Sequence, residues 1–314
     1  MPNVGAGTVW NLPNYFGELF TASHLQTPVL TMSGGLNGGY QVDNFEFPTD
    51  QSYTHETAAQ PSITETASLT APTAISYVRA QEKNVCQIVQ EQVSISYAKL
   101  SASGRMSGIA TSGKVVSPTN EKDWQILIAL QKIARDMEFS ILQGTYAIAV
   151  NAGVASTTRG LNAAAVLASN TIAAGSVQLT KAHIQALLKL MYDDGAVFMN
   201  PVIIVNSFQK GILSNLYGYA PMDRNVGGVN IKQIETDFGN IGVVLDAFQL
   251  ASVVTVADLA FVKVVSQPVV GKGNLFYEEL AKVGASELGQ IYGQLGLDHG
   301  PSFMHGTITG LTTS

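Results

Sequence analysis

Few residues in this sequence have the types and the spacing that chemistry requires. Asp298, His299 and His305 could offer a carboxylate and two imidazoles to a metal ion. Their spacing does not match a pair of ligands on one helix, so we interpret the histidines as loop residues. Cys86 is the single cysteine. It excludes an intrachain disulfide, and we expect it to be a small buried side chain.

Catalytic motifs are also missing. Asp237, Phe238 and Gly239 spell the metal-binding triplet of protein kinases, but no HRD loop accompanies them, so we interpret the triplet as a turn before a strand. The GxxxxGK[ST], GxSxG and HExxH patterns do not occur. We therefore predict that the chain is not an enzyme and has no catalytic, cofactor-binding or metal-binding residues.

The distribution of charge is the most informative feature. The first 78 residues contain no lysine or arginine, and the first basic side chain is that of Arg79. The net charge of −6 therefore comes entirely from the carboxylates of this stretch, and the rest of the chain is neutral. Such segregation is unusual in a folded enzyme domain and typical of an arm or loop that lies on neighbouring subunits.

The low content of charged residues also indicates contact with other subunits. Only 13% of the 314 residues are charged, about half of the usual share of roughly 25%. We interpret this as a surface that other subunits largely cover. The basic residues form no cluster, which argues against tight binding of nucleic acid by the chain alone. No apolar run is long enough to span a membrane.

The elements that would position side chains follow from periodicity. Residues 121–143 carry an apolar residue every three or four positions and begin with two carboxylates, which predicts a long amphipathic helix. Thr180 is expected to cap a second helix that ends near Gly195. Short strands are predicted at 40–47, 88–97, 202–205, 241–245, 253–256 and 261–265. Residues 274–310 contain seven glycines, which indicates short strands and turns there.

The stretch 48–78 is different in kind. It has serine or threonine at 11 of its 31 positions, which favours a long β-ribbon or an extended loop over a helix. Before it, residues 1–39 combine aromatic side chains with proline and glycine, which indicates an extended arm.

Several ordered segments together resemble one known family, the SU10-type major head proteins among tailed-phage capsid proteins of the HK97-like fold. The segments are 14–19 (NYFGEL), 27–30 (TPVL), 84–88 (NVCQI), 93–96 (VSIS), 135–138 (RDME), 236–239 (TDFG), 279–284 (ELAKVG) and 305–306 (HG). The resemblance spans nearly the whole chain.

This resemblance implies an α+β fold with named parts. They are an N-terminal arm (1–39), an extended E-loop β-hairpin (40–83), a P-domain (84–147) with a long spine helix at about 121–143, an A-domain (148–270), and a return to the P-domain with the C-terminus (271–314). The candidate contacts between subunits are the aromatic residues of the arm and E-loop: Trp10, Tyr15, Phe16, Phe20, Phe45 and Phe47.

The implied function is a major capsid protein that self-assembles, as hexamers and pentamers, into the icosahedral head shell around a phage genome. The implied partners are a separate scaffolding protein, a portal, a decoration protein in some shells, and packaged double-stranded DNA close by without specific binding. The implied location is the virion, after assembly in the host cytoplasm. A bacterial encapsulin-like protein or a surface-layer protein is the alternative.

One departure from the family pattern bears on how the shell is held. Some relatives join their subunits through an E-loop lysine, and here no lysine precedes Lys83. We therefore expect no covalent cross-link of that kind.

Overall fold

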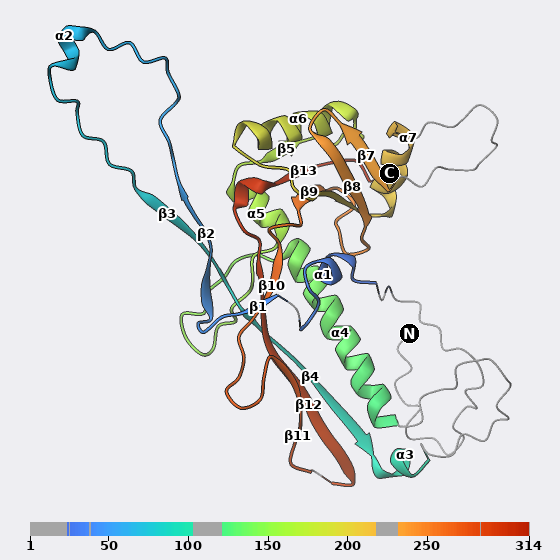
Figure 1. Ribbon diagram of the computed structural model, residues 1–314. Helices are drawn as coiled ribbons and strands as arrows, with labels where there is room; N and C mark the ends of the chain where they lie inside the picture. The colour runs from blue at the N-terminus through green and yellow to red at the C-terminus, as the bar shows by residue number, and fades with distance from the viewer. Residues whose placement is uncertain are drawn as a thin grey trace.

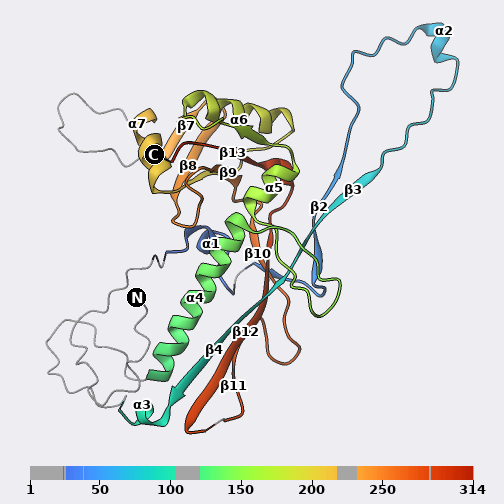
Figure 2. The same cartoon turned by 180° about the vertical axis from the view of Figure 1, so that it is seen from behind.

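The computed structural model describes residues 24, 26–37, 39–102, 121–217, 232–282 and 284–313. Two β-sheets with their helices form the body, and a long two-stranded ribbon extends away from it (Figure 1). Seen from behind, the far end of the ribbon still stands clear of both sheets (Figure 2). The arm residues Trp10, Tyr15, Phe16 and Phe20 lie outside the described residues.

The first sheet is built around one long strand. β12 (Ser286–Asp298) pairs antiparallel through its residues 286–295 with the whole length of β4 (Gln87–Ser96). Its other edge pairs with β11 (Leu275–Glu279) and β10 (Lys263–Ser266), and β1 (Tyr40–Gln41) adds to β10 in parallel. The short helix α3 (Tyr97–Ala102) follows β4 directly.

Helix α4 (Glu121–Gln143) lies along this sheet and matches the predicted bounds. Its buried face is formed by Ile133, Met137, Ile141 and Leu142, each at most 1% exposed. Ile133, Met137 and Ile141 follow one another at four-residue intervals, which places them on one side of the helix, and Leu142 lies next to Ile141. Short α1 (Pro28–Met32) packs against α4 through Val29 and Leu30. Helix α4 therefore contacts both α1 and the first sheet.

The second sheet has six strands in the order β5-β13-β9-β6-β8-β7. Their bounds are β5 (Thr171–Ala173), β13 (His305–Thr309), β9 (Val254–Asp258), β6 (Pro201–Val205), β8 (Gly239–Leu245) and β7 (Gln233–Thr236). All five residues of β6 are buried, as expected of an inner strand covered on both faces.

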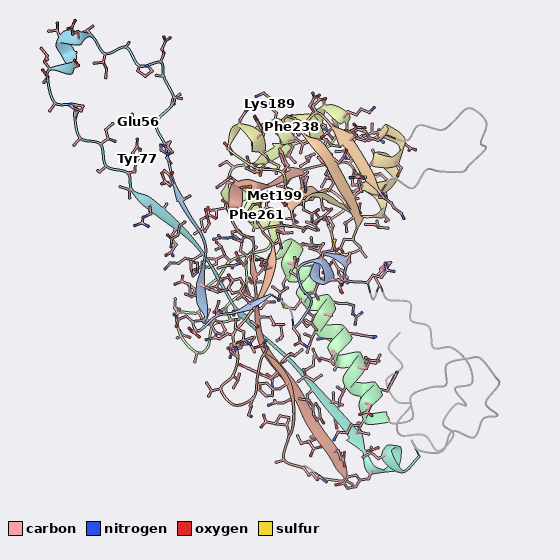
Figure 3. The ribbon with its side chains drawn as sticks, in the orientation of Figure 1. Glu56, Tyr77, Lys189, Met199, Phe238 and Phe261 are labelled. Carbon is pink, nitrogen blue, oxygen red and sulfur yellow. The ribbon has the colours of Figure 1, made fainter. Side chains whose placement is uncertain are left out.

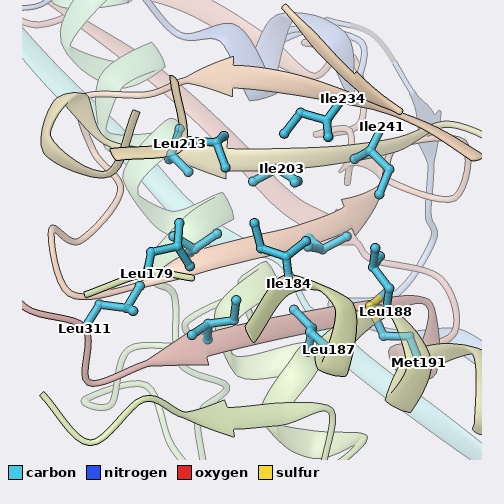
Figure 4. Packing of buried hydrophobic residues seen from close by; sticks show 14 of the residues in the cluster. Leu179, Ile184, Leu187, Leu188, Met191, Ile203, Leu213, Ile234, Ile241 and Leu311 are labelled. Atoms are coloured by element: carbon cyan, nitrogen blue, oxygen red, sulfur yellow. The ribbon is translucent and has the colours of Figure 1, made fainter. Parts of the chain in front are cut away.

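The side chains on the two faces of β6 belong to two different hydrophobic clusters. Ile203 and Val205 pack in a cluster with α6 (Lys181–Asp193) and α7 (Ser207–Tyr217). Figure 4 shows this cluster between helix α6 and the sheet. Val202 and Ile204 point to the opposite side and join the cluster around α4 and α5 (Leu161–Leu167). The predicted cap is confirmed, since Thr180 Oγ1 accepts from the His183 N–H at 3.3 Å.

One prediction for the C-terminal part is wrong. Residues 274–310 do not form only short strands, because β12 alone has 13 residues. In the strand pairing, β10 belongs to the first sheet and β13 belongs to the second sheet.

Candidate assembly surfaces

The third sheet is the ribbon that leaves the body. It pairs β2 (Glu46–Tyr53) with β3 (Arg79–Val85). Between them, residues 54–78 form an extended loop with the short helix α2 (Glu65–Ser68) at its far end. Every residue of 54–78 is exposed. Figure 3 labels Glu56 and Tyr77 of this loop, well away from both sheets.

This loop exposes large apolar side chains. The most exposed are Leu69 at 85%, Val78 at 83% and Ile63 at 74%, and Ile75 is 59% exposed. Soluble monomers seldom collect so many apolar side chains on a segment that no core supports. The loop therefore has the character of a surface that another chain covers.

Aromatic rings gather where the ribbon opens into the loop. The ring centroids of Tyr53 and His55 are 4.8 Å apart, and those of His55 and Tyr77 are 5.3 Å apart. Tyr53 and Tyr77 remain 55% and 50% exposed. Aromatic side chains supply much of the contact energy at protein interfaces, so this group is a candidate anchor.

The charge of the hairpin is one-sided. Between Tyr53 and Arg79 the only carboxylates are those of Glu56 and Glu65, and there is no lysine or arginine. A covering subunit would meet these carboxylates best with neutral or basic groups.

The base of the ribbon is fixed by one buried amide. Asn84 is 0% exposed. Its Nδ2 donates to the carbonyl oxygens of Arg159 at 3.1 Å and Leu297 at 2.6 Å. Its Oδ1 accepts from the N–H groups of Val85 at 2.9 Å and Arg159 at 2.7 Å. All four bonding positions of the side chain are filled, which joins β3, β12 and the 158–159 segment.

Further polar contacts brace the same base. Glu46 accepts from Lys83 Nζ at 3.2 Å and from the Tyr146 hydroxyl at 3.1 Å. Glu82 Oε1 accepts from Ser302 Oγ at 2.7 Å. These bonds set the direction in which the ribbon leaves the body, although exposed ion pairs such as Lys83–Glu46 contribute little to stability.

Replacing Asn84 by alanine should destabilise the subunit by about 3 kcal/mol, because two carbonyl groups and two N–H groups would lose their partner in a dry site. Chemical unfolding of the purified subunit measures this. Gln81→Ala is the control, since Gln81 is exposed on the same strand, and it should change stability by less than about 0.5 kcal/mol. Equal losses in both variants would contradict the assigned role of Asn84.

The structure places the two predicted E-loop contacts differently. Phe47 is 2% exposed and packs with Cys86 and Val265 of its own chain. Its side chain belongs to the core of the subunit and presents no surface to a neighbour, which corrects the prediction for this residue. Phe45 packs at the edge of the same cluster and is half-buried, and its contact with a neighbour stays a prediction.

Sequence reasoning missed the residues that are exposed instead. Leu69, Ile63 and Val78 lie in the serine- and threonine-rich stretch, where attention to aromatic residues alone passes over them. The signal that could have found them is an isolated apolar side chain every few residues in a stretch with no helix or strand period.

The residues first considered for chemistry have structural roles. His299 and His305 are fully buried, and burial lowers the pKa of each below its ordinary value. Asp298 accepts from the Tyr40 hydroxyl at 2.8 Å. Cys86 is buried, which raises the pKa of its thiol to about 12 and makes it a poor nucleophile.

Within the described ranges, no group of three or more histidine, cysteine or carboxylate side chains could hold a metal ion. Asp237 and Phe238 form the turn between β7 and β8, as predicted. In the same part of the chain, no helix combines the length and the apolar character needed to cross a bilayer.

Together, a long helix on a sheet, a second α/β body and a projecting hairpin define a class of protein, the shell-forming capsid proteins of the HK97-like fold. The SU10 major capsid protein family model matches residues 3–312. The chain belongs to this family.

Solved structures support the fold. The "Cyanophage A-1(L) capsid asymmetric unit" matches with a TM-score of 0.68 at 14% identity and covers 96% of this chain and 97% of that one. "Capsid of native GTA particle computed with C5 symmetry" gives a TM-score of 0.57 at 12% identity, with 94% and 93% covered. The holo-SrpI encapsulin complex from Synechococcus elongatus PCC 7942 gives 0.53 at 8% identity, with 88% and 85% covered. A search of curated proteins finds no match.

Proposed function

We propose that this major capsid protein builds a closed icosahedral head from pentamers and hexamers in which each subunit lays its β2–β3 hairpin across a neighbour. The observation that carries this proposal is the loop 54–78, whose large apolar side chains are left exposed by the described residues of their own chain. A segment of this kind is stable and soluble only when another surface covers it.

The parts of the subunit map onto the fold as follows. The β2–β3 hairpin serves as the E-loop, α4 with the first sheet as the P-domain, and the six-stranded sheet with α6 and α7 as the A-domain. This division follows the strand pairing, so it assigns β10 to the P-domain and β13 to the A-domain. Residues 1–39 serve as the arm. Within this range, α1 packs in the core of the subunit through Val29 and Leu30.

The wider assembly is proposed from the family. A separate scaffolding protein, a portal and, in some shells, a decoration protein accompany the subunits, and packaged double-stranded DNA lies close by without specific recognition. Assembly takes place in the host cytoplasm before the virion is complete. The subunit acts through contacts and carries out no catalysis, in keeping with the structural roles of its buried histidines and cysteine.

Sedimentation velocity of the purified protein tests the proposal. Assembly into shells gives particles of megadalton mass, whereas a compact monomer at every concentration and with scaffold supplied would contradict it. Flat sheets or fibres would favour a surface-layer protein. The encapsulin likeness, at 8% identity, shows the shared fold alone, and particles that package a cargo protein and no DNA would favour that alternative.

Mature particles boiled in detergent under reducing conditions should give one band near the subunit mass of 33.2 kDa. Lys83 is the only lysine of residues 40–83, and it lies at the base of the ribbon in an ion pair with Glu46. The shell must therefore be held by the summed area of many modest contacts. A ladder of covalent dimers, trimers and larger rings on the gel would contradict this account.

A further inference from the structure

A buried carboxyl pair lies where α1, α4 and the second sheet meet. Glu138 of α4 is 0% exposed. Its Oε1 accepts from the Val29 N–H at 2.8 Å, and its Oε2 accepts from the Leu30 N–H at 2.6 Å. One side chain of the long helix thus holds both of these N–H groups of α1.

The second carboxyl group comes from the end of β8. Asp246 is 1% exposed, and its Oδ1 accepts from the Phe248 N–H at 2.8 Å. Its Oδ2 is also buried and has no protein donor in the described structure. Asp246 lies close enough to Glu138 to raise the pKa of that carboxyl group, so the two buried carboxyl groups are neighbours.

The surroundings supply no compensating cation. Asp246 is the one charged side chain among the described residues that perturbs Glu138. Neither α1 nor α5, which pack in the same cluster, carries a titratable residue. On α4 itself, Arg135 and Asp136 lie nearest in sequence, and neither pairs with Glu138 within the described part of the chain.

The pKa of Glu138 is raised from an ordinary value of 4.5 to about 9, mainly because the group is buried and next because Asp246 is close. The two backbone N–H groups of α1 act in the opposite direction and lower this pKa. Two ionised carboxylates in contact in a dry site repel strongly, so such pairs titrate together.

We propose that Glu138 and Asp246 share one proton, and that this proton latches α1 onto the junction of α4 and the second sheet. The proton on one carboxyl group is donated to the other, which gives the buried Oδ2 of Asp246 a hydrogen-bond donor. When the proton is lost, both groups are negative and α1 must move to admit water. The latch is a property of the subunit and does not depend on the proposed shell.

The sign of the pH effect follows from linkage. The latched state binds the proton more tightly than the detached state, in which Glu138 has its ordinary pKa. The latch is therefore strongest below pH 4.5 and weakens as the pH rises towards 9. In this window the fraction of molecules with α1 detached should rise about tenfold per pH unit, and it should level off above the window.

Hydrogen exchange of the full-length protein, followed by mass spectrometry on peptides that cover residues 26–37, tests this proposal. After correction for the intrinsic exchange rate, protection of the Val29 and Leu30 amides should fall about tenfold per pH unit between pH 5 and pH 9. Protection of the buried strand β6 should not follow this slope. Constant protection of Val29 and Leu30 across the window would overturn the proposal.

Variants separate the shared proton from general effects of burial. Asp246→Asn should remove the slope, because its amide donates to the Glu138 carboxylate without titrating and its oxygen still accepts from the Phe248 N–H. Glu138→Gln should lower the protection at every pH, because its amide nitrogen replaces one of the two oxygens that accept from α1. The control is Asp136→Asn, an exposed carboxylate on the same helix, which should keep the wild-type slope. An unchanged slope in Asp246→Asn would overturn the proposal.

If these variants do not fold, infrared spectroscopy of the wild-type protein tests for the shared proton without any substitution. The carbonyl band of a protonated carboxylic acid should persist at pH 7 and disappear as the pH passes about 9. Its absence at pH 7 would overturn the shared proton directly.

Discussion

Replacing residues 56–75 by a short glycine–serine linker is expected to leave a folded subunit that forms no closed shell. The loop makes no contribution to the three hydrophobic clusters of the subunit, since all of its residues are exposed. Thermal unfolding of the subunit should therefore be unchanged. Assembly should fail because the variant loses Ile63, Leu69 and Ile75, the apolar side chains proposed to bind a neighbour.

Sedimentation and electron microscopy measure this loss. The matched control keeps the length of the loop and replaces Thr57, Thr70 and Thr73 by serine, which leaves the apolar side chains in place. Control shells should form normally. Normal shells from the linker variant would show that the hairpin is not the main contact between subunits.

The second large effect concerns α4. Ile133→Asp should lower stability by about 4 kcal/mol or more, because it buries an unpaired charge in the cluster between α4 and the first sheet. Ile133 is 1% exposed, whereas Leu127 on the same helix is 52% exposed. Leu127→Asp is therefore the control and should cost less than about 1 kcal/mol.

Chemical unfolding of both variants, together with soluble yield, gives the comparison. If Leu127→Asp were as damaging as Ile133→Asp, the buried face of α4 would be assigned wrongly. If Leu127→Asp folded normally but failed to assemble, the exposed face of α4 would be a contact between subunits as well.

Elements whose signals are local were predictable from the sequence. The apolar spacing of 121–143 predicts α4 at its observed bounds, and the Thr180 cap with the stripe of Ile184, Leu187 and Met191 predicts α6. The short run 202–205 predicts the buried strand β6. In each case the residues that decide the structure are neighbours in the chain.

The C-terminal glycines were misinterpreted because their role depends on distant residues. A Cβ at Gly289 would lie 2.0 Å from the Tyr277 hydroxyl, and one at Gly296 would lie 2.9 Å from the Val85 carbonyl oxygen. Both glycines are inside β12, where they let other chain segments approach closely. Nothing in the local sequence separates such a glycine from one that forms a turn.

The candidate site was predictable in outline only. The lack of basic residues before Arg79 marks a region that includes most of the hairpin, and its contact with neighbouring subunits stays a prediction. Phe47 was expected at an interface and lies in a core, since its environment is set by Val265, more than 200 positions away. Glu138 was missed because a carboxylate within an amphipathic helix is usually solvated, and its partner Asp246 is remote in sequence.

Cryo-electron microscopy of the assembled particle tests the central claim most directly. The account predicts a closed shell in which density for residues 54–78 crosses a neighbouring subunit and covers Ile63 and Leu69. A shell in which this loop folds back on its own subunit, or remains uncovered in solvent, would contradict it.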